Sequence, residues 1–349
     1  MGIVLNILLL IFVLGILIFV HELGHYLFAK KHKVHIYEFA LGMGPKLLSR
    51  VGRDGVLYSL RAFPIGGFCA LAGQEGEDDE NLKKDDFMCN KTAWQKIQIL
   101  LAGVGCNILL ALILLFGSAL IWGATNLRPV ISEVIEGFPM AEAGIGPGDT
   151  ITSINGRRVR TWDKAQLILH LNHEGPYIFV IRHADGAKEK YEITPIIETN
   201  EEGVERQIFG FGVDTTKERG LIPSLTYSFV KLGAIISSMG LVIISLFTGN
   251  LSLNALAGPV GIYGVVGDSA SLGLEYLIYI IAFLSINLAF INALPFPAFD
   301  GGRILFIIIE KIKGSPVNPK IENMLHTIGF ILLIALMLYV TFNDILRLF

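Results

Sequence analysis

Charged residues are scarce in this chain of 349 residues, because only 17% are Asp, Glu, Lys or Arg whereas 52% are hydrophobic. The mean hydropathy of +0.59 is too high for an ordinary water-soluble protein. It is typical of a protein that crosses a membrane several times and carries a modest soluble insert. An excess of basic charge is also missing, since the formal net charge is −3. We therefore expect a lipid bilayer around the protein and no nucleic-acid partner.

Cysteine is nearly absent as well. The three cysteines, Cys69, Cys89 and Cys106, show no C-x-x-C spacing, so a disulfide framework is not indicated. The first apolar run lacks the basic segment and the small-residue cleavage site of a signal peptide. We interpret it as a retained membrane span.

Long apolar runs, by contrast, are frequent. Five approach or exceed the roughly 20 residues that a helix needs to cross a bilayer. They are Ile3–Phe28, Ile97–Trp122, Leu225–Phe247, Leu274–Ala293 and Ile321–Thr341.

A soluble α+β block is expected between the second and third runs, at about residues 128–216. Its predicted elements are strands at Pro129–Val134, Asp149–Ile154, Tyr177–Arg182 and Lys190–Ile193, a tight turn at Asn155-Gly156, and a helix at Trp162–His170. The segment Val34–Leu71 is rich in Gly and Pro and has strand-like runs such as Val56–Leu60. We predict β-hairpins or a re-entrant loop there, packed against the spans.

The distribution of Lys and Arg predicts the orientation. These residues crowd the segment between the first two runs and recur at Arg303–Lys320, which places both segments in the cytoplasm. The second span then leads the soluble block outside. An odd number of crossings must separate that block from Arg303–Lys320, so only one of the two intervening runs crosses. Leu225–Phe247 is interrupted by Lys231 and small residues, and we predict that it lies at the outer surface. The result is about four spans with both termini outside.

An H-E-x-x-H motif, His21 to His25, closes the first apolar run. On a helix, His21 and His25 share one face and can bind one metal ion, while Glu22 can accept a proton from a water molecule. A tetrahedral catalytic zinc site needs a third protein ligand. Asp300 is the candidate, because an ionisable group directly after an apolar run is costly unless it is paired or binds a metal. Pro295 and Pro297 break the helix before it, and we expect Gly301 and Gly302 to let the chain bend there.

H-E-L-G-H followed by Asn292-Ala-Leu-Pro-Phe-Pro-Ala-Phe-Asp-Gly-Gly302 resembles the site-2 protease family of intramembrane zinc metalloproteases, in its bacterial regulator-of-sigma branch. Ala257–Gly261 and Phe342–Asp344 extend the resemblance over most of the chain. The block with Ala141–Asp149 and Ile154–Gly156 resembles a bacterial PDZ domain.

The resemblance implies an α-helical polytopic membrane protein with a membrane-associated β-region and an inserted extracytoplasmic PDZ-like α+β domain. The expected domains are a first half of the membrane core at 1–127, with the β-region at 34–72, the PDZ-like domain at 128–217, and a second half at 218–349. The surface segment at 221–250 belongs to the last. The implied location is the bacterial inner membrane.

The same resemblance implies Zn²⁺ held by His21, His25 and Asp300, with Glu22 as general base. Asn292 would hydrogen-bond the substrate carbonyl or oxyanion. Asn287, Gly66 and Gly67 are further substrate-binding candidates, although Asn287 also suits a hydrogen bond between helices. The implied substrates are single-pass membrane proteins such as anti-sigma factors, or remnant signal peptides.

Two other functions would also suit parts of this sequence. A non-proteolytic membrane scaffold would use only the PDZ-like block, and a metal transporter would need several polar positions along a path. The motifs favour a protease. A helical substrate must unwind before it is cut, and the β-region is expected to hold the unwound segment by strand addition, with Val56–Leu60 as the candidate strand.

Overall fold

The computed structural model describes residues 2–73, 82–171, 175–199, 205–315 and 317–347. Five of its helices are long and apolar enough to cross a membrane. They are α1 (Ile3–Lys31), α2 (Ala93–Trp122), α5 (Leu221–Phe247), α7 (Leu274–Ala293) and α9 (Pro319–Leu346). The predicted helices are confirmed, and the chain is a multi-pass membrane protein with a β-region.

The chain divides into two compact units, residues 1–114 with 253–349 and residues 115–252. The first contains α1, α7 and α9 and the shorter helices α6 (Pro259–Leu272) and α8 (Asp300–Lys313), with 3₁₀ turns at Lys84–Asp86, Met88–Asn90 and Leu253–Ala255. Val13 and Leu17 of α1 are buried against Val266 of α6. Within each helix the backbone satisfies its own hydrogen bonds, which the interior of a bilayer requires.

The start of α6 is held by α9. Asp344 accepts hydrogen bonds of 2.8 Å from the backbone N–H groups of both Gly258 and Gly261. These N–H groups have no partner within a helix at its first turn, and a carboxylate there is favoured by the helix dipole. Two distant segments, around Gly258 and around Asp344, therefore form one capped joint.

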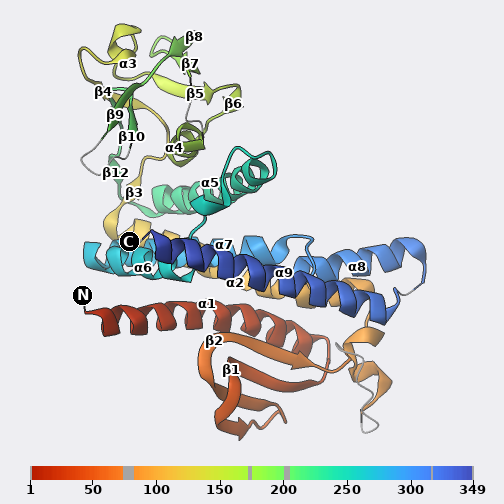
Figure 1. The fold of residues 1–349 in the computed structure, drawn as a ribbon. Coiled ribbons are helices and arrows are strands. Elements are labelled where there is room, and N and C mark those ends of the chain that lie inside the picture. The colour runs from red at the N-terminus through yellow and green to blue at the C-terminus, as the bar shows by residue number, and fades with distance from the viewer. Residues whose placement is uncertain (1, 74–81, 172–174, 200–204, 316, 348–349) are drawn as a thin grey trace. The chain divides into compact units, whose positions relative to one another are not determined.

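The β-region is a single curled hairpin of two long strands, β1 (Ile36–Val51) and β2 (Leu57–Leu71), beside α1 (Figure 1). Each strand bends, so the first part of β1 pairs with both parts of β2: Phe39 lies opposite Cys69 and also opposite Tyr58. Tyr58 in turn lies opposite Arg50. The order across the sheet is 67–71, 36–41, 57–60, 46–51.

This register has a direct consequence for substrate binding. Residues 57–60 have a partner on both sides, so the expectation that Val56–Leu60 receives an added strand is wrong. Within the part of the chain that the structure describes, residues 67–71 and 46–51 each pair on one side only and form the open edges.

The sheet is tied to α1. Phe39 packs edge-on against Phe19 and Tyr26. At the turn between the strands, Asp54 accepts hydrogen bonds from the Tyr26 hydroxyl at 2.7 Å and from Lys30 at 2.9 Å. The Tyr26 hydroxyl and the Lys30 ammonium hold the pKa of Asp54 well below its usual range.

The second unit contains the inserted α+β domain. Its strands are β3 (Ala124–Thr125), β4 (Ile131–Val134), β5 (Thr150–Ile154), β6 (Arg157–Arg158), β7 (Tyr177–Arg182), β8 (Lys188–Ile193), β9 (Ile196–Thr199), β10 (Glu205–Ile208), β11 (Phe211–Val213) and β12 (Lys217–Glu218), with helices α3 (Pro139–Glu142) and α4 (Trp162–Leu171). The predicted strands and the helix at 162 are confirmed. Asn155 and Gly156, both with positive φ, make the predicted turn between β5 and β6.

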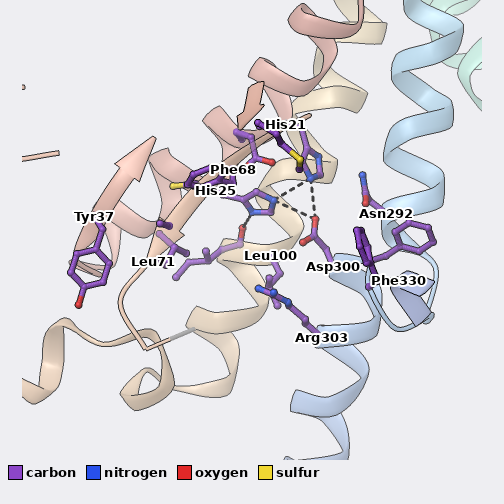
Figure 2. A pocket seen from close by; sticks show the side chains of 18 residues that line it. His21, His25, Tyr37, Phe68, Leu71, Leu100, Asn292, Asp300, Arg303 and Phe330 are labelled. Carbon is purple, nitrogen blue, oxygen red and sulfur yellow. Dashed lines mark hydrogen bonds and ion pairs between the residues drawn. The ribbon is translucent and has the colours of Figure 1, made fainter. Parts of the chain in front are cut away.

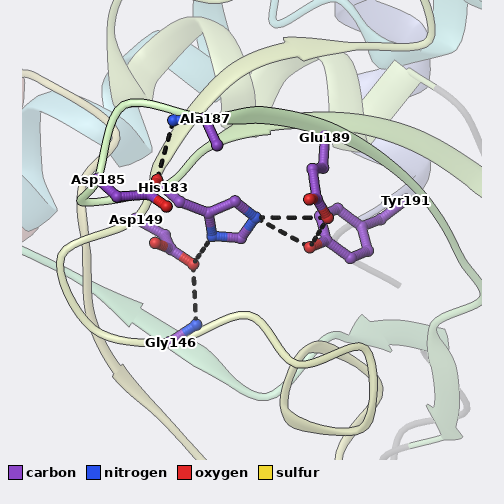
Figure 3. Close-up of polar contacts among 7 residues, drawn as sticks. All are labelled: Gly146, Asp149, His183, Asp185, Ala187, Glu189 and Tyr191. Carbon is purple, nitrogen blue, oxygen red and sulfur yellow. Dashed lines mark hydrogen bonds and ion pairs between the residues drawn. The ribbon is translucent and has the colours of Figure 1, made fainter.

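A polar cluster fixes one loop of this domain (Figure 3). Asp149 is buried, accepts a hydrogen bond from the N–H of Gly146, and lies 2.9 Å from Nδ1 of His183. The other ring nitrogen of His183 lies 2.9 Å from the hydroxyl of Tyr191. Burial and the Glu189 carboxylate raise the pKa of Tyr191. We interpret the cluster as structural, because each of its members is bonded to another member.

Helix α5 belongs to the same unit as the inserted domain. Lys231 is buried and donates to both oxygens of Asp163 on α4, each at 2.8 Å. Leu241, ten residues further on, packs against the domain's hydrophobic core. Ten residues of helix span about 15 Å, so a substantial length of α5 lies along the domain.

Candidate metal centre and active site

His21 and His25 lie on one face of α1, as the motif predicts. Both are buried, and their Nε2 atoms are 3.2 Å apart. Gly24 faces α2, and a Cβ there would lie 2.3 Å from the carbonyl oxygen of Ala102. A Cβ on Gly103 would lie 2.6 Å from Nε2 of His25. Helices α1 and α2 can therefore lie this close together only because Gly24 and Gly103 have no side chains.

Asp300 comes to the same point from the opposite half of the sequence. Its Oδ2 lies 3.2 Å from Nε2 of His21 and 3.3 Å from Nε2 of His25 (Figure 2). Among the described residues, these three form the one cluster of His, Cys, Asp or Glu that could hold a metal ion. The sequence prediction that they converge is met by the geometry.

The three atoms fit a zinc ion. Zinc binds His and carboxylate ligands at about 2.0–2.1 Å in a tetrahedron, whose edges are then about 3.3–3.4 Å long. The observed triangle has sides of 3.2, 3.2 and 3.3 Å. Oδ2 of Asp300 is buried and accepts no hydrogen bond from any residue that the structure describes. An acceptor atom left in this way is suited to a cation.

A second contact leaves His25 in a form that could bind a metal ion. Its Nδ1 lies 2.9 Å from the carbonyl oxygen of Ile99 on α2. A carbonyl can only accept, so Nδ1 carries the proton and Nε2 keeps its lone pair free. No feature of the sequence marks Ile99, because any residue offers a carbonyl.

The loop before Asp300 is held in an unusual conformation. Ala298 has φ of +83°, which side chains rarely adopt. Its N–H donates to Nδ1 of His326 on α9 at 2.9 Å. A Cβ on Gly329 would lie 2.6 Å from the carbonyl oxygen of Pro297, so α9 also packs directly on this loop. The sequence reading missed His326, whose 28-residue separation from Ala298 gives no local signal.

The two glycines after Asp300 act differently from the expectation. Gly301 and Gly302 lie in the first turn of α8 and neither has positive φ. They are needed for space instead, because a Cβ on either would lie 2.3 Å from the carbonyl oxygen of Leu294 or of Phe296. The bend itself comes at the prolines, since α7 ends at Ala293.

A cavity of about 710 Å³ opens on the cluster. Glu22, Asn292 and Gly67 line it together with His21, His25 and Asp300. Asn287 and Gly66 are not among its lining residues, and Oδ1 of Asn287 is buried with no partner among the described residues. The geometry therefore brings Glu22, Asn292 and Gly67 to the site, and it leaves Asn287 and Gly66 outside the cavity wall.

One open edge of the sheet forms a wall of the cavity. Gly67, Cys69 and Leu71 line it, and the backbone N–H of Cys69 faces the Glu22 carboxylate. Alternate residues of a strand direct their N–H and C=O groups to the same side, so Gly67 and Leu71 point theirs the same way as Cys69. An unpaired strand edge beside a possible metal site can hold an extended peptide.

The fold and the site together define a membrane-embedded metalloprotease. A family model for peptidase family M50 matches residues 9–336, and the chain belongs to that family. It is 31% identical to the zinc metalloprotease RasP of Bacillus licheniformis, over 97% of this chain and 98% of the relative. It is 30% identical to the regulator of sigma-W protease RasP of Bacillus subtilis, with the same coverage. RasP of Geobacillus kaustophilus is 31% identical, over 97% of each chain. The protein is a zinc metalloprotease.

Proposed function

We propose that this protease cuts peptide bonds within membrane-embedded segments of single-pass membrane proteins, with His21, His25 and Asp300 as zinc ligands. One observation carries the proposal. The three ligand atoms form a triangle of the size that zinc requires, and two of them lie on a helix long enough to span a bilayer.

Zinc, when bound, supplies an activated water and polarises the peptide carbonyl. The chain's own residues do the rest. The Glu22 carboxylate accepts the proton of the attacking water and returns it to the nitrogen of the leaving amine. The side-chain amide of Asn292 lines the cavity and makes no hydrogen bond with the residues that the structure describes, and it donates to the carbonyl oxygen as negative charge develops. Removal of such a donor typically costs about 10²–10³ in rate.

The substrate must be extended when it is cut, because a helix keeps its carbonyls in internal hydrogen bonds. We place the unwound segment on the open edge of β2, at Gly67, Cys69 and Leu71, which lines the cavity. Proline at residue 71 removes an N–H from that edge and leaves the backbone of Cys69, which faces Glu22, unchanged. It should reduce cleavage strongly without reducing zinc content. Proline at residue 49, whose N–H points outward from the opposite open edge, is the matched control and should have little effect on cleavage.

The catalytic roles are tested by two substitutions in the full-length protein, purified in detergent and assayed on a model single-span substrate. Glu22→Gln should keep zinc, as metal analysis measures it, and lose cleavage. Asp300→Ala should lose zinc and cleavage together. Cleavage by Glu22→Gln at the wild-type rate would refute the general-base role, and a scaffold without enzymatic function would be indifferent to both changes.

We further propose that the substrates include anti-sigma factors, or remnant signal peptides, in a bacterial inner membrane. The Bacillus subtilis relative is named as a regulator of sigma-W protease, which supports the first class. The inserted domain at 128–217, which we take to be PDZ-like and extracytoplasmic, would then restrict access to the site.

The contacts of α5 support the topology of four spans. Lys231 and Leu241 both contact the inserted domain, so only the residues after Leu241 could enter the bilayer freely. They are far fewer than the roughly 20 needed to cross. Single cysteines at the exposed positions Ile222 and Phe247, in a variant without the native cysteines, should both react with an impermeant maleimide from outside. Labelling of position 247 from the cytoplasmic side alone would show that α5 crosses.

A further inference from the structure

Arg303 is the one cationic side chain among the described residues that line the catalytic cavity. It follows Asp300 by three residues, so both lie in the first turn of α8. In Figure 2 its side chain extends from α8 towards Leu100, away from Asn292. Leu71 and Leu100 line the cavity with it. A charge at this place faces whatever peptide occupies the cavity.

The guanidinium group of Arg303 makes no hydrogen bond or ion pair with any residue in the described ranges. Three other basic side chains near the β-region are paired: Lys30 with Asp54, and Arg61 and Lys46 with Glu38. Glu322 and His326 of α9 are near enough to feel the charge of Arg303, but neither contacts it within 4.0 Å. Arg303 is half-buried, so water does not surround it fully.

We propose that Arg303 binds a carboxylate of the peptide, on the cytoplasmic side of the bond that is cut. A guanidinium is planar and presents two parallel N–H groups to a carboxylate, which makes this pair both strong and directional. The inference rests on the proposed function, because the open edge of β2 would bring an extended chain past His25 and Leu71 towards Arg303.

Two sources of carboxylate have this chemistry. One is an Asp or Glu side chain of the substrate, just on the cytoplasmic side of the cut, and in that case Arg303 determines sequence preference. The other is the new C-terminal carboxylate that hydrolysis creates, and in that case Arg303 holds the product and slows its release.

The first arm of the test compares substrates with Glu or Gln at each of the four positions on the cytoplasmic side of the cut. Wild-type enzyme should cleave the better Glu substrate about 10- to 100-fold faster in kcat/KM, as expected of a charged hydrogen bond. Arg303→Gln should bring the ratio near one. Arg303→Glu, tested with Lys at the same position, should reverse the preference. That gain cannot come from misfolding.

Lys311→Gln is the matched control, because it removes one positive charge from an exposed position of the same helix. It should keep the wild-type ratio. The second arm measures inhibition by product peptides that end in a free carboxylate or in an amide. Wild type should prefer the free acid by about tenfold or more, and Arg303→Gln should not.

A change of ratio in either arm supports the proposal and identifies the source of the carboxylate. Equal ratios for wild type and Arg303→Gln in both arms overturn it. An effect of Arg303→Gln that depends on the anionic lipid content of the vesicles, and not on the peptide, also overturns it, because Arg303 then binds a headgroup phosphate. Glu22→Gln, assayed in parallel, reports separately on the proposed protease mechanism.

Discussion

His326 provides a sharp test of the proposed metal centre, because it makes no hydrogen bond or ion pair with His21, His25 or Asp300. Its Nδ1 accepts the N–H of Ala298, two residues before Asp300, in a loop whose backbone is strained at φ +83°. His326→Ala leaves that N–H without an acceptor, which costs about 1–3 kcal/mol in a buried setting. The left-handed conformation of Ala298 costs a further ~1–2 kcal/mol that the loop can release by moving.

A loop that moves no longer presents Asp300 to the histidines. If the lost hydrogen bond is felt fully at the ligand, zinc binding weakens by about 5- to 150-fold, since 1.4 kcal/mol is a factor of ten. The measurement is a zinc dissociation constant from competition with a chelator, on full-length protein in detergent, with cleavage recorded alongside.

Two further variants separate positioning from general destabilisation. His326→Asn puts a side-chain oxygen where Nδ1 was and should recover most of the affinity. Ala298→Gly removes the Cβ that strains the loop and should recover part of it when combined with His326→Ala. Unchanged zinc affinity in His326→Ala, or an equal loss in His326→Asn, would refute the argument.

Other predictions concern helix packing. Gly24→Ala should abolish zinc binding or prevent folding, because its Cβ would lie 2.3 Å from the backbone of Ala102. Gly15→Ala, on the same helix, places its Cβ in open space and should change neither the thermal unfolding temperature nor the cleavage rate. Lys231→Met removes the ion-pair partner of Asp163 and should weaken the packing of α5 on the inserted domain by about 1–3 kcal/mol, since Asp163 is partly exposed. The measurement is the rate of proteolysis within α5, which should rise. An unchanged rate would contradict a stabilising role of the pair.

Much of the architecture could be read from the sequence because its physical causes are local. A run of some 20 apolar residues has few alternatives to a helix in a bilayer, and all five predicted helices are present. The Asn155-Gly156 turn is equally predictable, since this residue pair readily adopts the positive φ that a two-residue hairpin turn requires, and both residues have positive φ. The spacing of His21 and His25 fixed a shared face, and the cost of an unpaired Asp300 beside an apolar run suggested its partner.

The strand order of the β-region could not be predicted from local sequence. Its strands were expected, but which of them has a free edge depends on a bend that lets one strand pair twice. Only the register shows that residues 57–60 are interior and 67–71 are open. The sequence cannot reveal this, because pairing is set by contacts between residues far apart in the chain.

The sequence by itself determined which residues are candidate metal ligands and which segments contain them, since a histidine pair at helical spacing and a lone carboxylate after an apolar run can each be recognised from local chemistry. The tertiary structure decided everything that holds them in place: the carbonyl of Ile99, the glycines that admit α2, and the hydrogen bond from Ala298 to His326. These contacts join residues that are far apart in the sequence. A backbone carbonyl or a glycine that makes such a contact cannot be distinguished in the sequence from one that does not.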